Sequence, residues 1–200
     1  MPIIRTVRAT SRCEIPKIRG SRFAAALGPA ASHADAQAFV RAQRDEAPDA
    51  THVCSAWRLA SGDARANDDG EPNGTAGRPI LQEIEGRDLC DMVVTVTRWY
   101  GGTKLGTGGL VRAYGAAAAA GLDAADVVAV PITVALSLRF GYGDSGAVQG
   151  ALVAADATVV DSRYEVDVAL TVAVPIEHDE ALRRALRDAT AGRIVLSKVG

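Results

Sequence analysis

Apolar and polar positions in the first 130 residues repeat with two different periods, which predicts a mixture of strands and helices. Period-two alternation and β-branched runs mark the expected strands, which are two within residues 1–28, joined near Pro16–Lys17, and one each at Val53–Leu59 and Met92–Arg98. Helical periodicity marks the expected helices, which are one from a Ser32 cap to Glu46–Pro48, a short one at Pro79–Gly86 and an alanine-rich one at residues 109–125. Residues 63–79 contain many glycines and polar residues, so we expect a long loop there.

The pattern changes near Asp126–Pro131, and the last seventy or so residues alternate between the two periods in a regular order. The expected elements are a strand at Ile132–Phe140, a helix capped at Asp144 or Ser145, strands at Thr158–Asp161 and 166–174, a helix at 181–189 and a strand at Arg193–Val199. This β-α-β-β-α-β order is that of a ferredoxin-like domain. The sequence therefore predicts an α+β protein with one domain at residues 1–130 and a ferredoxin-like domain at residues 131–200.

The composition narrows the class of protein. Hydrophobic residues make up 48% of the 200 positions, which excludes a disordered chain, and the formal net charge of −2 excludes a globally basic nucleic-acid binder. The three cysteines, Cys13, Cys54 and Cys90, form no C-x-x-C pair, so we expect neither a disulfide scaffold nor a metal site. We expect a cytoplasmic protein without a membrane segment or a cofactor, and the sequence leaves the oligomeric state open.

A glycine-rich segment that runs from a strand into a helix is the first candidate site. Its candidate contact residues are Arg98, Trp99, Tyr100, Gly101, Gly102, Lys104, Gly106, Gly108, Gly109 and Arg112. Free backbone N–H groups at a helix N-terminus, together with the three cations, favour an anion such as a phosphate. The spacing fits neither a Walker A loop nor a dinucleotide-binding loop, and a purely structural tight turn is the alternative. Trp99 and Tyr100 are neighbours at a strand end and should point to opposite faces.

An acidic loop is the second candidate, with Asp68, Asp69, Glu71 and Thr75 as its candidate residues. Clustered carboxylates can bind a divalent cation, but the spacing is not that of an EF-hand. Asp68 and Asp69 could instead accept backbone N–H groups in successive turns, and we favour this structural role. His52 and Cys54 share one face of a strand, and without an orienting third residue we favour structural roles for both. No catalytic residue is assigned.

Six cations within residues 5–22 form the third candidate surface. They could contact RNA or another phosphate-rich partner along one face of the expected strand pair. A solvated sheet edge, kept soluble by its charge, explains them equally well.

Long strings of residues resemble the Impact family, whose bacterial members are known as YigZ proteins. The matching strings are Thr51–Ala56, Asp68–Pro72, Gly74–Gly77 and Arg98–Gly115. The resemblance implies an N-terminal domain like domain 2 of ribosomal protein S5 and a C-terminal domain like domain V of elongation factor G. It also implies a link to translation, because eukaryotic members regulate translation by binding a protein partner.

The leading functional hypothesis is therefore a non-enzymatic binding protein linked to the regulation of translation. It would contact the ribosome, RNA or a translation-associated protein through the glycine-rich basic loop. The alternative is an enzyme or binder that acts on a phosphorylated small molecule or nucleotide, because related small-molecule kinases share the implied fold. A third possibility is that both loops only stabilise the fold.

Overall fold

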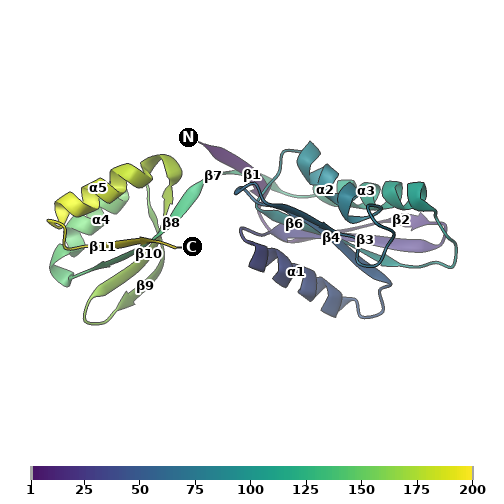
Figure 1. Cartoon of the computed structure of the whole chain (residues 1–200), viewed down its shortest axis with the longest axis horizontal. Coiled ribbons are helices and arrows are strands. Elements are labelled where there is room, and N and C mark those ends of the chain that lie inside the picture. Colours follow the sequence, from purple (N-terminus) through teal and green to yellow (C-terminus); the bar gives the residue numbers. More distant parts are fainter. Residues whose placement is uncertain (1, 200) are drawn as a thin grey trace. The chain divides into compact units, whose positions relative to one another are not determined.

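The computed structural model describes residues 2–199 and confirms the α+β class (Figure 1). The chain divides into two compact units. One comprises Ile4–Val130, and the other comprises the chain from Pro131 onwards together with the residues up to Ile3. No helix within the described residues combines the length and the apolar composition that crossing a bilayer requires.

The first unit is built around a five-stranded antiparallel sheet in the order β2-β3-β6-β4-β5. The strands are β2 at Ser11–Ile18, β3 at Ser21–Pro29, β4 at His52–Arg58, β5 at Ala64–Asn67 and β6 at Met92–Trp99. Helix α1 (His33–Glu46) covers one face, and α2 (Gly77–Gly86) and α3 (Thr107–Asp123) cover the other (Figure 1). Strands β1 (Ile3–Val7) and β7 (Val127–Pro131) pair in a separate two-stranded sheet.

The main core of this unit lies between the sheet and helices α2 and α3. Its largest fully buried side chains include Phe23, Ile80, Ile84, Met92 and Tyr114. Helix α3 lies close to the sheet near Gly121, where its buried residue is small. A Cβ added at Gly121 would lie 3.0 Å from the Cβ of Ala25. This close packing fixes the helix, and with it the loop that precedes it.

The N-terminal segment differs from the sequence prediction. Residues up to Pro29 form three strands rather than two, and the turn between β2 and β3 is at Arg19–Gly20, not at Pro16–Lys17. Pro16 lies within β2, an edge strand, where a residue without an N–H group is tolerated. Gly20 has a φ of +84°, which suits a glycine at a tight turn. The expected loop at 63–79 also contains the short strand β5.

The second unit contains a four-stranded antiparallel sheet in the order β11-β8-β10-β9, with α4 and α5 packed on it. Its elements are β8 at Thr133–Phe140, α4 at Ser145–Ala154, β9 at Thr158–Tyr164, β10 at Val168–Pro175, α5 at Asp179–Ala189 and β11 at Val195–Lys198, with single 3₁₀ turns at Tyr142–Asp144 and Ile176–His178. The observed succession of strands and helices is the expected ferredoxin-like one.

Two details of the second unit differ from the prediction. Neither Asp144 nor Ser145 caps α4 with its side chain. Asp144 instead forms an ion pair with Arg193, and the Ser145 hydroxyl donates to the carbonyl oxygen of Tyr142. Val166, expected within the strand, precedes β10 and is 88% exposed. The alternating pattern therefore continues beyond the hydrogen-bonded ladder.

Candidate functional site

The acidic loop and the glycine-rich loop, which are separate in the sequence, meet through a buried ion pair. Arg98, near the end of the central strand β6, donates from Nη1 to Oε1 of Glu71 at 2.6 Å. The two side chains are only 6% and 4% exposed. The hydroxyl of Tyr114 on α3 donates to the same oxygen at 2.7 Å. Burial raises the pKa of Tyr114, so its hydroxyl remains protonated and available as this donor.

The position of Arg98 corrects one expectation from the sequence. Arg98 was expected to contribute to an exposed contact surface, but 5% of the residue is exposed. Its guanidinium reaches Glu71 on one side and the hydroxyl of Ser21, 3.4 Å away, on the other. The arginine therefore connects the two loops and the start of β3 instead of projecting from the surface.

A pocket of about 510 Å³ lies where the two loops meet. Five residues that were candidates on sequence grounds line it, namely Glu71, Arg98, Tyr100, Lys104 and Gly106. Its other lining residues are Thr51, His52, Pro72, Leu105, Thr107 and Leu110. Gly106 and Thr107 form the N-terminus of α3, where backbone N–H groups lack intrahelical acceptors. The pocket thus combines charged, apolar and N–H donor groups within one unit of the chain.

His52 is a pocket residue for which the sequence analysis favoured a structural role. Its Nδ1 lies 2.7 Å from the carbonyl oxygen of Asp69, an acceptor, so we assign the ring hydrogen to Nδ1. The other nitrogen, Nε2, lies 3.9 Å from Oε1 of Glu71. His52 and Arg98 are direct partners in the register of β4 and β6. This register places the histidine at the site. In the sequence, its signals were the shared strand face with Cys54 and its place in the family-matching string Thr51–Ala56.

Within the acidic loop, Asp68 and Asp69 organise the backbone. Asp68 accepts from the N–H groups of Ala76 and Gly77 through Oδ1 and from Gly74 through Oδ2, at 2.8–2.9 Å. Burial alone would raise the pKa of Asp68, but the hydrogen bonds from Gly74, Gly77 and Ala76 outweigh it and lower the pKa below its ordinary value.

Asp69 and Thr75 also use their polar atoms within the protein. Asp69 accepts from the N–H group of Val53 at 2.6 Å and pairs with Arg44 at 2.5 Å. The Thr75 hydroxyl donates to the carbonyl oxygen of Pro72 at 2.6 Å. Among residues 2–199, no group of three or more His, Cys, Asp or Glu gathers as a metal site would require. Of the four acidic-loop candidates, Glu71 is the one that lines the pocket.

The glycines of the second loop have two separate structural roles. A Cβ on Gly101 would lie 1.9 Å from the carbonyl carbon of Gly20, so the loop and the β2–β3 turn touch backbone to backbone. Gly102 and Gly106 have φ values of +85° and +71°, which glycine adopts without strain. Gly108 and Gly109 lie in the first turn of α3. These constraints explain the glycines at positions 101, 102 and 106 without reference to a ligand.

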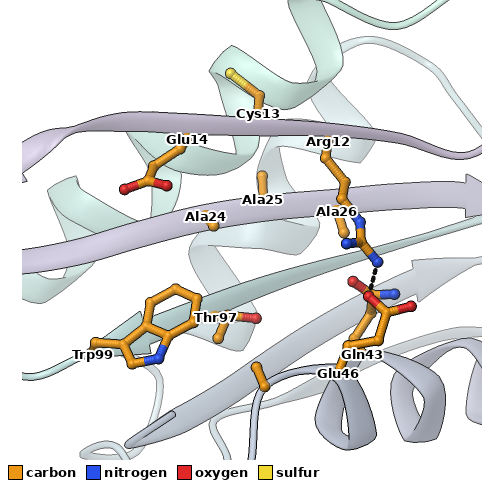
Figure 2. A pocket seen from close by; sticks show the side chains of 11 residues that line it. Arg12, Cys13, Glu14, Ala24, Ala25, Ala26, Gln43, Glu46, Thr97 and Trp99 are labelled. Carbon is orange, nitrogen blue, oxygen red and sulfur yellow. Dashed lines mark hydrogen bonds and ion pairs between the residues drawn. The ribbon is translucent and has the colours of Figure 1, made fainter. Parts of the chain in front are cut away.

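The aromatic pair projects to opposite faces of the sheet. Tyr100 is 46% exposed and lines the pocket. Trp99 faces the α1 side, where it lines a second cavity of about 300 Å³ (Figure 2). The guanidinium carbon of Arg22 lies 4.5 Å from the centre of its ring, and Arg12 and Glu46 form an ion pair in the same cavity. Tyr100 is therefore the member of the pair that is available beside the glycine-rich loop.

Four of the six cations of the basic N-terminal segment have partners within the fold. Arg5 donates to the carbonyl oxygen of Arg87, and Arg8, Arg12 and Arg22 pair with Asp126, Glu46 and Glu14. These contacts favour the structural interpretation for four of the six cations.

Several exposed cations form no hydrogen bond or ion pair within residues 2–199, and three of them lie at or beside the glycine-rich loop. These three are Arg19, Lys104 and Arg112, and we call them the basic end of the first unit. Arg19 and Arg112 line another pocket, of about 300 Å³, with Leu105, which also lines the larger pocket beside Lys104. The basic end therefore borders the pocket.

Cys54 is expected to be unreactive. Burial raises the pKa of this thiol to about 12, and its Sγ donates to the carbonyl oxygen of Asp68. Burial also raises the pKa of Cys90, whereas Cys13 is partly exposed. At pH 8 we expect a disulfide-exchange reagent to label Cys13 rapidly and the other two thiols only after denaturation. Rapid labelling of Cys54 in the folded protein, identified by mass spectrometry, would contradict the buried environment described for it.

Comparisons with known proteins match both units. Residues 19–122 match the Impact N-terminal domain, and residues 138–193 match a domain of unknown function (DUF1949). The chain is 33% identical over 186 residues to the IMPACT family member YigZ of Escherichia coli strain K12, covering 91% of each protein. It is 39% identical over 178 residues to the IMPACT family member in the pol 5′ region of Thermus thermophilus, covering 88% of this chain and 97% of that relative.

One solved structure is similar over the full length. This crystal structure of a hypothetical protein is 31% identical, with a TM-score of 0.74, and the match covers 100% of this chain and 98% of the other. The full-length similarity includes both units, and the matched strings surround the pocket. The chain belongs to the IMPACT family.

Proposed function

We propose that this protein is a non-enzymatic binding protein linked to the regulation of translation, and that it contacts RNA of the translation machinery through its basic end and glycine-rich loop. The observation that supports this proposal is the distribution of charge. Arg19, Lys104 and Arg112 are exposed and unpaired around one loop, whereas Arg5, Arg8, Arg12 and Arg22 are bonded within the fold. A local cluster of free cations can bind phosphates although the whole chain has a net charge of −2.

The groups beside the basic end also suit RNA. The first turn of α3 offers backbone N–H donors for phosphate oxygens. The exposed ring of Tyr100 can stack on an unpaired base. The proposed link to translation itself comes from family membership, and the proposed RNA contact comes from these side chains.

The test is a charge-matched pair of double variants. Lys104→Ala/Arg112→Ala is expected to weaken binding to single-stranded RNA by roughly tenfold and to reduce the slope of log affinity against log salt by about 1.4. Fluorescence anisotropy at several salt concentrations measures both quantities. The same variant should fail to sediment with ribosomes at low salt.

The control Arg41→Ala/Arg65→Ala removes the same charge from exposed positions in α1 and β5 of the same unit. It should bind RNA like the wild type, because these residues lie outside the basic end. Equal weakening by both double variants would indicate a diffuse charge effect and contradict the proposed surface.

A further inference from the structure

We propose that the pocket binds a single nucleotide unit, with an amino group of the base donating to Glu71 and the phosphate at the N-terminus of α3 beside Lys104. The inference rests on the proposed function and specifies the part of an RNA that the protein recognises. The same chemistry is present in a free nucleoside monophosphate and in an unpaired nucleotide of RNA. The experiment below distinguishes these two sources.

The first observation is a carboxylate oxygen at the pocket that has no donor from the described residues of the protein. Oε1 of Glu71 accepts from both Arg98 and Tyr114, but Oε2 accepts no hydrogen bond from any residue in the range 2–199. The side chain is 4% exposed and lines the pocket. Oε2 is not among the fully buried atoms that lack a partner, so it is accessible at the pocket that Glu71 lines, and a ligand N–H group that replaces water there gains a charge-assisted hydrogen bond. Nε of Arg98, by contrast, is buried without a partner.

The second observation is that the same pocket contains an uncapped helix N-terminus and a lysine. Helix α3 is 17 residues long, its cap residue Gly106 has no side chain, and no side chain caps its first turn. Gly106 and Thr107 line the pocket together with Lys104, whose ammonium group is unpaired in the described part of the chain. Free N–H groups, the helix dipole and a lysine together favour a phosphate. A ligand that satisfies both ends has a donor group at one end and an anion at the other.

The space between the two ends suits a base. The pocket volume of about 510 Å³ exceeds what a phosphate alone fills, and the lining between the charged groups includes Pro72, Leu105 and Leu110. The half-exposed ring of Tyr100 lies at the same pocket and provides a stacking surface. A nucleotide carries matching groups in the same spatial order, namely an amino group that can donate, a flat ring that can stack and a phosphate.

The free oxygen of Glu71 predicts which bases bind. Adenine, cytosine and guanine carry an exocyclic amino group that can donate to a carboxylate. Uracil carries two carbonyl oxygens on either side of its single ring N–H, and these oxygens repel a carboxylate. Cytosine and uracil have the same ring size, so a comparison of their affinities measures the effect of the amino group that faces Glu71. We expect cytidine nucleotides to bind about tenfold more tightly than uridine nucleotides.

The experiment measures binding of the full chain to C₆ and U₆ RNA hexamers of equal length and charge, and to free CMP, UMP and cytidine. Wild-type protein should prefer C₆ to U₆ by about tenfold. Glu71→Gln presents an amide where the carboxylate lies, and the preference should fall to about threefold or less. Tyr100→Leu should weaken both hexamers by about 5- to 100-fold without changing the preference. Tyr164→Leu, which removes an exposed tyrosine of the other unit, is the control and should change neither quantity.

Each outcome decides between the alternatives. Thermal unfolding shows whether the Glu71→Gln variant is folded. If that variant does not fold, the surface variant Tyr100→Leu still tests the pocket. Equal binding of C₆ and U₆, weakened only by Lys104→Ala/Arg112→Ala, would leave the proposed function intact and overturn the nucleotide pocket. Binding of CMP over UMP and cytidine, with no binding of hexamers, would support the pocket for a free nucleotide and overturn the RNA function. Absence of binding in every arm would overturn both.

Discussion

Replacement of Glu71 by alanine is expected to lower the free energy of unfolding by about 3–5 kcal/mol, because it leaves the guanidinium of Arg98 buried without its counter-ion. Tyr114 loses its hydrogen-bond acceptor at the same time. Both partners are more than nine-tenths buried, so water from the adjoining pocket replaces only part of the interaction with the carboxylate. Urea unfolding followed by circular dichroism measures the change.

Two further variants separate the ion pair from general effects of mutation. Glu85→Ala removes an exposed carboxylate from the same region and should change stability by no more than about 0.5 kcal/mol. Combining Glu71→Ala with Arg98→Met removes both charges and should recover much of the lost stability, since a buried pair replaced by apolar side chains is often tolerated. A loss below about 1 kcal/mol in Glu71→Ala, or no recovery in the double variant, would contradict the buried pair.

Replacement of Asp68 by alanine is expected to have the second largest effect, a loss of about 3 kcal/mol at pH 7, since three backbone N–H groups lose a charged acceptor. The effect should depend on pH. Burial alone would raise the pKa of Asp68, but its hydrogen bonds lower it below the ordinary value. A carboxylate with a lowered pKa in the folded state stabilises the protein above the pKa of the unfolded chain, and this contribution is lost as the pH falls through the lowered value.

Urea unfolding at pH 7 and near pH 3 tests the direction in which the stability contributed by Asp68 changes with pH. The difference between the wild type and Asp68→Ala should be larger at pH 7 and shrink in acid. Asp45→Ala, which removes an exposed aspartate from α1, should show little difference at either pH. A difference for Asp68→Ala that grows as the pH falls would be inconsistent with the hydrogen bonds described here.

The sequence correctly predicted the elements that depend on patterns of neighbouring residues. Strand β6 is rich in β-branched residues, and every position except its last is buried. Ser32 accepts a hydrogen bond from the N–H group of Asp35, so the predicted cap of α1 is confirmed. In the second unit, strict alternation of Val168, Leu170, Val172 and Val174 gave the correct buried face of β10. These features depend on periodicity and side-chain chemistry within about ten residues.

The arrangement of the site could not be predicted because it depends on contacts between distant segments. Arg98 and Glu71 are 27 residues apart, and Arg8 and Asp126 are 118 apart. A surface role was a reasonable prediction for each cation taken alone, since an isolated charge is costly to bury. Pro16 misled the prediction of the first turn for a related reason: a proline marks a turn in most contexts, and only the order of the sheet shows that β2 is an edge strand.

The contact between Gly20 and Gly101 has a consequence for how the site assembles during folding. The pocket is lined by segments around residues 51, 71, 98 and 104. The backbone of the β2–β3 turn contacts the backbone of the glycine-rich loop. These segments come together only when the whole five-stranded sheet has formed, so partly folded chains lack the pocket. A bound ligand should therefore protect the amide hydrogens of the entire first unit from exchange with solvent, and not only those of the loop that touches it.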